Sequence, residues 1–151
     1  MLVIAHRGAS KESCENSLLA FKKAIECGAN RIELDVRLIA DSSVVVFHDS
    51  SLKRVIGIKK SLKRLTLKDL RKLRLPNGEY IPLLDEVLDV FLPEIEINIE
   101  VKGKNVTLIK NVINVIKNHI IYEHKIILSS FETKPLVYAL KNYPYVKRAC
   151  L

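Results

Sequence analysis

The chain has 151 residues, of which 48% are apolar and 28% are charged, a composition typical of one globular domain with a hydrophobic core. Its 25 basic and 17 acidic residues give a formal net charge of +8. This composition excludes a disordered chain, and since no apolar stretch approaches the roughly 20 residues of a membrane span, we expect no transmembrane segment.

The first third of the chain predicts a strand, a helix and two further strands. A short apolar run, Leu2–Ala5, precedes a helical spacing of apolar residues over positions 15–27, which Gly28 is suited to end in a left-handed cap. Strands follow over Ile32–Val36 and Val44–Phe47. Because the connection between these two is too short for a crossover helix, they either pair antiparallel or join without a full crossover.

Residues 49–82 differ from the rest of the chain because they are basic and poor in strand signals. Thr66 and Asp69 have the spacing of a capping box that opens a helix, and Pro76-Asn77-Gly78 ends it. The stretch from Asp49 to Leu75 alone has a net charge of +8, because two acidic residues stand against ten basic ones: Lys53, Arg54, Lys59, Lys60, Lys63, Arg64, Lys68, Arg71, Lys72 and Arg74.

The remaining chain alternates helices with strands. In order, it predicts helix Leu83–Phe91 with Pro82 suited to its first turn, strand Ile95–Val101, helix Val106–Lys117, strand Lys125–Ser129, helix Lys134–Asn142 and a strand that begins near Tyr145. This alternation predicts an α/β fold with a mostly parallel sheet. Polar residues at the strand ends favour a TIM-type (β/α) barrel over an open doubly wound sheet. The turn at His6–Ser10 also lacks the glycine spacing of a dinucleotide-binding loop.

Ionisable residues follow four of the predicted strands at the point where each strand ends. Side chains two positions apart on a strand share a face, so Glu33 points the same way as Asp35, and Glu100 the same way as Lys102. This pattern is typical of an active site at one end of a parallel sheet. The full set is His6, Arg7, Glu33, Asp35, His48, Asp49, Glu100 and Lys102.

The three carboxylates and two of the histidines suggest a division of chemical roles. Glu33, Asp35 and Glu100 supply hard oxygen ligands, a set that suits Mg²⁺ or Ca²⁺ better than zinc. His6 and His48 each follow an apolar strand, so both imidazoles would lie over the same mouth. There they can serve as general acid and general base near neutral pH.

Arg7 and Lys102 add two cations able to hold phosphate oxygens. Together with a metal and two imidazoles, they point to attack at the phosphorus of a phosphoester. The alternative is a purely structural role, in which the carboxylates and cations only neutralise one another. His119 and His124 lie in a helix-to-strand connection, and we expect them to be structural.

In the combination and order of its sequence motifs, the chain resembles the glycerophosphodiester phosphodiesterases. The matching stretches are Ala5-His6-Arg7-Gly8, Glu15-Asn16-Ser17, Gly28-Ala29, Ile32-Glu33-Leu34-Asp35-Val36, Val46-Phe47-His48-Asp49, Ile81-Pro82-Leu83-Leu84-Asp85-Glu86-Val87-Leu88, Ile99-Glu100-Val101-Lys102 and Ser129-Ser130-Phe131. The resemblance implies a TIM-type barrel with a small insertion after His48, which corresponds to about residues 49–82.

The resemblance also implies hydrolysis of a glycerophosphodiester, such as a deacylated phospholipid head group, to glycerol 3-phosphate and an alcohol. This is the chemistry of a phosphoric diester hydrolase in lipid and glycerol metabolism. Glu15 matches a family position, for which we expect only a supporting role. By the same resemblance, the acid–base pair is His6 and His48, the phosphate contacts are Arg7 and Lys102, and the ligands of Mg²⁺ or Ca²⁺ are Glu33, Asp35 and Glu100.

A complete (β/α)₈ barrel takes about 250 residues, whereas the predicted elements account for five to six of eight strands. We therefore expect residues 1–151 to form a single partial domain, a barrel truncated at its C-terminal end. An unclosed barrel leaves unpaired backbone groups at its sheet edges, so we expect instability, aggregation or pairing with another chain, including self-association.

Other functions fit the same residues. One is a catalytically inactive truncated remnant or binding module, and another is a related phospholipase D-type lipid phosphodiesterase. Nucleic-acid binding is disfavoured because no aromatic residue is interleaved in the basic stretch. The expected partner is therefore a small-molecule glycerophosphodiester.

The cysteines bear on the compartment. Cys14, Cys27 and Cys150 are odd in number and lack metal-type spacing, so we expect reduced thiols in a cytoplasmic protein. Met1–Ala5 is too short for the core of a signal peptide, in keeping with that expectation.

Overall fold

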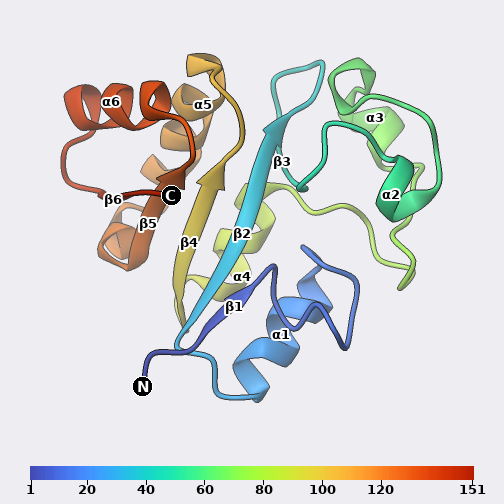
Figure 1. Ribbon diagram of the computed structural model, residues 1–151, viewed down its shortest axis with the longest axis horizontal. Coiled ribbons are helices and arrows are strands. Elements are labelled where there is room, and N and C mark those ends of the chain that lie inside the picture. The colour runs from blue at the N-terminus through green and yellow to red at the C-terminus, as the bar shows by residue number, and fades with distance from the viewer.

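The computed structural model describes all 151 residues and contains one six-stranded sheet flanked by helices (Figure 1). Five strands are parallel and lie side by side in chain order, and β3 alone pairs antiparallel, with β2. The strands are β1 (Ile4–His6), β2 (Arg31–Leu38), β3 (Val44–Val46), β4 (Glu96–Val101), β5 (Ile126–Ser130) and β6 (Lys147–Cys150).

The order of the strands distinguishes the two predicted architectures. A doubly wound sheet reverses its strand order at one point, whereas here the order β1-β2-β4-β5-β6 runs without reversal. This confirms the barrel-type fold, and the doubly wound alternative is wrong. The sheet is open, because β1 and β6 each pair with a single strand.

Helices connect the successive parallel strands. They are α1 (Leu18–Glu26), α2 (Lys53–Ile56), α3 (Leu67–Leu70), α4 (Leu84–Phe91), α5 (Val106–Lys117) and α6 (Thr133–Asn142), with 3-10 turns η1 (Leu62–Arg64) and η2 (Ile120–Lys125). None of them combines the length and apolar character needed to cross a bilayer.

Two predicted helix starts need correction. Helix α1 begins at Leu18 rather than near residue 15, because the Ser17 side chain caps it by accepting a hydrogen bond from the backbone N–H of Ala20. Pro82 lies ahead of α4 and not in its first turn. That helix begins at Leu84, and the carboxylate of Glu86 accepts a hydrogen bond from the backbone N–H of Leu83 at 2.8 Å.

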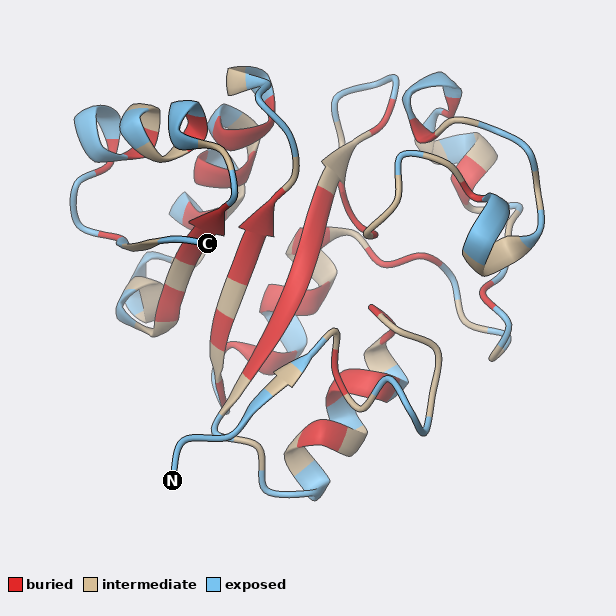
Figure 2. Cartoon of the chain, in the orientation of Figure 1, coloured by how far each residue is buried: buried red, intermediate tan, exposed pale blue.

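The main core lies between the sheet and its helices. Figure 2 shows β2 and β4 buried along most of their length, whereas β1 at the sheet edge is largely exposed. The apolar residues of the two central strands share one cluster with those of α4 and α5: Ile32, Leu34, Ile97, Ile99, Leu88, Val112 and Ile113. Because side chains alternate along a strand, this burial directs Glu33, Asp35 and Glu100 to the opposite, inner face.

Residues 49–82 contain α2, η1 and α3 and pack around a second, smaller core. The capping box predicted at Thr66 is present, since Thr66 and Asp69 exchange side-chain and backbone hydrogen bonds. The smaller core combines apolar residues of this region with others from the segment before it: Leu52, Leu62, Leu65, Leu70, Leu75 and Ile81, with Ile39, Val45 and Phe47. This packing anchors the chain on both sides of His48, which follows β3.

Candidate active site

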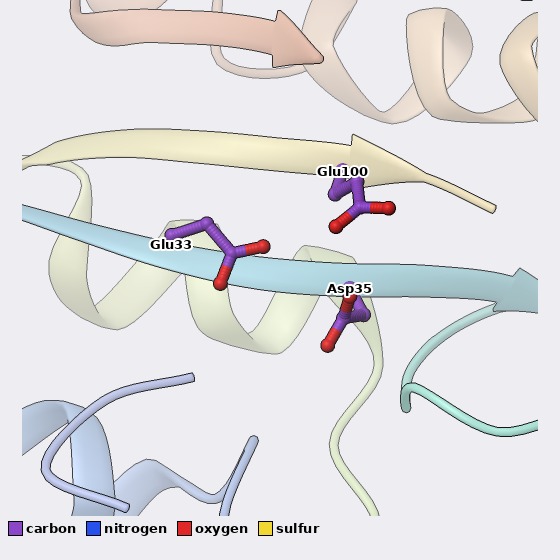
Figure 3. Close-up of side chains that lie close together, drawn as sticks. All are labelled: Glu33, Asp35 and Glu100. Carbon is purple, nitrogen blue, oxygen red and sulfur yellow. The ribbon is translucent and has the colours of Figure 1, made fainter. Parts of the chain in front are cut away.

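Three carboxylates lie together on the inner face of the sheet, as Figure 3 shows. Glu33 and Asp35 stand two positions apart on β2, and Glu100 on β4 is the register partner of Asp35. One oxygen atom of each residue lies within 4.8 Å of the others, and all three residues are buried. Oxygen atoms at this separation can all contact one divalent cation.

Burial affects these carboxylates differently. Burial and the neighbouring Asp35 raise the pKa of Glu33 to about 7, although the backbone N–H of Arg7 donates to Glu33 Oε2 at 3.1 Å. Burial acts to raise the pKa of Asp35 too, but the Lys102 ammonium and the Asn16 amide outweigh it and hold that pKa below its usual range. A cation bound among these oxygens would favour the ionised form of both groups.

Two basic side chains contact the acidic cluster. Lys102 Nζ lies 2.5 Å from Glu100 Oε1 and 2.9 Å from Asp35 Oδ1, and Arg7 Nε lies 3.1 Å from Asp35 Oδ2. Neither Asp35 Oδ1 nor Arg7 Nε has a partner in hydrogen-bond geometry, although both are buried. Both atoms therefore retain the capacity to contact a ligand.

The loop after β1 has an unusual backbone that brings Arg7 to the cluster. Arg7 and Asn16 both have positive φ angles, of 59° and 57°, and the backbone N–H of Asn16 donates to the Arg7 carbonyl at 3.0 Å. The loop packs so closely on α1 that a Cβ atom on Gly8 would lie 2.7 Å from the Ala20 carbonyl carbon. Asn16 Nδ2 then donates to Asp35 Oδ2 at 2.9 Å.

The two predicted catalytic histidines approach the cluster from different strands. His6 ends β1, and its Nε2 lies 3.8 Å from Glu33 Oε2. His48 follows β3, and its Nδ1 lies 2.5 Å from Asp49 Oδ1. The His48 carbonyl accepts a hydrogen bond from Arg37 Nε at 2.6 Å. Both the ring and the backbone of His48 are therefore held in place.

One cavity of about 450 Å³ joins these groups. Asp35 is absent from its wall because it is fully buried, but it contacts Arg7 and Lys102. The structure thus brings together all seven predicted site residues, whereas His119 pairs elsewhere, with Asp85 at 3.0 Å. The cavity is lined by His6, Arg7, Glu33, His48, Asn98, Glu100, Lys102, Phe131 and Leu151.

Arg54 contributes to the site from α2, a role that the sequence did not indicate. Its Nε donates to Asp49 Oδ2 at 2.7 Å, and its Nη1 and Nη2 donate to the two Glu15 oxygens at 2.8 and 2.6 Å. Glu15 Oε1 also accepts from Arg7 Nη1 at 3.2 Å. Arg54 therefore joins the carboxylate beside His48 to the carboxylate that holds Arg7.

Comparison with known proteins gives one consistent family. The chain matches the model of the Glycerophosphoryl diester phosphodiesterase family over residues 6–150. It is 38% identical to a glycerophosphodiester phosphodiesterase of Caldanaerobacter subterraneus, over 97% of this chain and 64% of that relative. A human lysophospholipase D is 34% identical over 77% of this chain and 41% of its own length.

Solved structures agree with this result. A phosphodiesterase of Oleispira antarctica in complex with the product sn-glycerol-3-phosphate has a TM-score of 0.91 and 29% identity, over 99% of this chain and 65% of that one. A glycerophosphodiester phosphodiesterase of Thermotoga maritima has a TM-score of 0.83 and 35% identity, over 99% and 62%. The chain thus spans slightly less than two thirds of the Caldanaerobacter relative and of these two structures, and 41% of the human relative.

Proposed function

This chain belongs to the glycerophosphoryl diester phosphodiesterase family, and we propose that it hydrolyses glycerophosphodiesters to glycerol 3-phosphate and an alcohol with the help of a divalent cation. The observation that carries the proposal is the single cavity in which an acidic cluster, two histidines and two basic side chains meet. The Oleispira phosphodiesterase, whose structure holds glycerol 3-phosphate, supports the choice of product.

Glu33, Asp35 and Glu100 are proposed to hold Mg²⁺ or Ca²⁺. The donor set consists of oxygen atoms alone, which these cations prefer. Its fit is supported by the mutual distances within 4.8 Å and by the buried Asp35 Oδ1, which has the Lys102 ammonium 2.9 Å away but no partner in hydrogen-bond geometry. When bound, the cation would neutralise charge that develops on the phosphoryl oxygens.

His6 and His48 are proposed as the acid–base pair. One imidazole takes a proton from the attacking water as the water oxygen bonds to phosphorus. The other imidazole gives a proton to the oxygen of the leaving alcohol as the bond between that oxygen and phosphorus breaks. Asp49 orients the His48 ring through Nδ1, which leaves Nε2 free for proton transfer.

Arg7 and Lys102 are proposed to contact the phosphate oxygens that do not react. Arg7 is held by Glu15 and Asp35, so its guanidinium has little rotational freedom to lose when substrate binds. Lys102 provides a point charge beside Glu100 at the end of β4. Positioned cations of this kind stabilise the phosphoryl group electrostatically.

The test is release of glycerol 3-phosphate from glycerophosphocholine by the purified chain with Mg²⁺ or Ca²⁺. We expect His6→Ala and Glu100→Gln each to lower the rate by about a hundredfold or more, and EDTA to abolish it until metal is restored. His124→Ala is the matched control, because His124 is exposed and outside the cavity.

Two outcomes would contradict this proposal. A wild-type rate no higher than that of the His6→Ala variant would favour a catalytically inactive remnant. Release of lysophosphatidic acid from a lysophospholipid, without activity on glycerophosphocholine, would favour a phospholipase D-type enzyme, a function suggested by the human lysophospholipase D relative.

We also infer that the chain belongs in a reducing compartment such as the cytoplasm. Cys27 and Cys150 are exposed thiols, Cys14 is half-buried, and none of the three forms a disulfide. Exposed thiols persist where glutathione keeps them reduced. Fractionation of the source cells, with thiol labelling of the recovered chain, tests this inference; an oxidised chain in an extracellular fraction would contradict it.

A further inference from the structure

A second cavity lies beside the candidate active site. It has a volume of about 440 Å³ and lies between the end of β2, the η1 turn and the segment that joins β4 to α5. Lys102 lines both this cavity and the one that holds the histidines and carboxylates. The two cavities are therefore neighbours on either side of Lys102.

The second cavity is lined by positive charge. Four of its residues are basic, namely Arg37, Lys63, Lys102 and Lys104, and none is acidic. No carboxylate lies within ion-pair distance of Arg37 or Lys63, and Lys104 has only Glu132, outside the lining, at 3.8 Å. This contrasts with the candidate active site, where Arg7 and Lys102 are each paired with carboxylates.

The other residues that line the second cavity are partly apolar. Arg37 is partly buried and uses its Nε to donate to the His48 carbonyl. Apolar side chains such as Leu38 and Leu62 complete the wall. Lys63 and Lys104 are exposed at the mouth of the cavity, whereas Arg37 and Lys102 are partly buried. A cavity that combines cations with apolar surface suits an organic group that carries an anion, because both parts of such a group find matching contacts.

We propose that this cavity binds a second anionic group of the substrate, a phosphate or carboxylate on the alcohol that leaves. The proposal rests on the proposed function, in which the reacting phosphate lies beside Lys102 in the adjacent cavity. The glycerol half of a glycerophosphodiester carries no further charge, so the second anion has to belong to the alcohol. The chain then prefers diesters of anionic alcohols over diesters of neutral or cationic ones.

The test compares two substrates that differ only in that group. They are glycerophosphoglycerol and its analogue with a phosphate on the leaving glycerol. We expect the wild type to show a kcat/KM at least about tenfold higher for the analogue, the factor supplied by one charge-assisted contact. The double variant Lys63→Ala/Lys104→Ala should lose most of this preference and leave the Arg37 contact to His48 intact.

Removal of two positive charges also weakens the long-range electrostatic attraction of a basic protein for any anionic substrate. The test therefore needs a control variant that loses the same charge elsewhere. The double variant Lys22→Ala/Lys117→Ala removes two exposed lysines that do not line the cavity, one on α1 and one at the last residue of α5, and should keep the full preference. Equal kcat/KM values for the two substrates in the wild type, or equal loss of preference in both double variants, would overturn the proposal.

Two further outcomes separate the proposal from its premises. If neither substrate is hydrolysed, the proposed function fails. Binding to the cavity is then tested alone, by calorimetry with the phosphate-bearing analogue. The proposal expects weaker binding to Lys63→Ala/Lys104→Ala than to the wild type, and equal binding would overturn it. If inorganic phosphate binds there as tightly as the analogue and the substrate preference is absent, the occupant is a free anion and the proposal is wrong.

Discussion

Arg54 lies outside the cavity lining and yet contacts both carboxylates that hold site residues, Asp49 beside His48 and Glu15 beside Arg7. Its hydrogen bond lowers the pKa of Asp49 to about 2, against a smaller opposing effect of burial. Asp49 therefore remains ionised at neutral pH and can hold the His48 ring. We therefore expect Arg54 to be a positioning residue, which acts through Asp49 and Glu15.

Replacing Arg54 should lower activity without unfolding the protein. We expect Arg54→Ala to reduce kcat on glycerophosphocholine about tenfold to a hundredfold, as loss of a group that orients a site residue does. The kcat of Arg54→Lys should lie between those of Arg54→Ala and the wild type. Because the Arg54 side chain is 49% exposed, the free energy of unfolding should fall by no more than about 1 kcal/mol. Arg64→Ala, an exposed change in the same region, is the control. An unchanged kcat for Arg54→Ala would exclude the positioning role.

Glu33 gives the metal-free protein a characteristic dependence on pH. Its folded-state pKa of about 7 lies above the ordinary value of 4.5, so the native state binds more protons than the unfolded state between these limits. The free energy of unfolding should therefore fall as pH rises from 4.5 through 7, by at most about 3 kcal/mol. Thermal unfolding in EDTA at several pH values measures this slope.

The matched variants are Glu33→Gln and Glu26→Gln. Glu33→Gln has no titrating carboxyl at this position and should flatten the slope, whereas Glu26→Gln changes an exposed side chain of α1 and should not. A slope that is identical in the wild type and in Glu33→Gln would show that other groups cause it.

At the scale of elements, the connection from β1 to α1 depends on close packing at Gly8. Gly8 has a φ of 78° and no room for a Cβ atom, whereas Gly28 has a φ of 82° with nothing within 4 Å of that position. Either Gly→Ala variant places a Cβ atom on a left-handed backbone, which costs about 1 kcal/mol. Only Gly8→Ala also brings that atom into a clash with the backbone of Ala20. We expect Gly8→Ala to lower the free energy of unfolding by at least about 2 kcal/mol more than Gly28→Ala, as measured by urea titration. Equal losses would contradict the packing argument.

The same scale shows what the sequence could predict. Alternation along β2 and β4 was sufficient to predict that Glu33, Asp35 and Glu100 share a face, because a strand has a fixed period of two. The left-handed backbone at Arg7 and Asn16 and the contacts of Arg54 were not predictable. Loop conformations and contacts between distant segments depend on tertiary packing, which leaves no regular spacing in the sequence. Asn16 had one weak signal, as a polar residue inside a stretch that matched the family.

At the scale of the whole molecule, the sheet has two unpaired edges. An exposed apolar segment leads into the edge strand β1: Leu2, Val3 and Ile4 are 58%, 42% and 45% exposed. β6 forms the other edge, with Leu151 half-exposed beyond it. Unpaired strand edges with apolar side chains are sites where another chain can add a strand.

We therefore predict that the chain self-associates through its edges. Sedimentation velocity should show species larger than a monomer whose proportion rises with concentration, and Ile4→Lys should reduce it, because a charged side chain on an edge strand opposes pairing. Val90→Lys is the control, since Val90 is 52% exposed and lies on helix α4, outside the two edge strands. A single monomeric species at all concentrations would contradict this prediction.

The pairing of β2 with β4 has a consequence for the order of folding. Asp35 and Glu100 are register partners although 65 positions separate them, so their contact closes a long loop of chain. Loop closure costs less entropy when the intervening chain is already compact, and the part of that loop from Ile39 to Ile81 packs into the smaller core. We expect this region to fold first and the acidic cluster to assemble afterwards. In pulse-labelling hydrogen exchange, amides around Leu70 should gain protection before those of β4, and the reverse order would exclude this sequence of events.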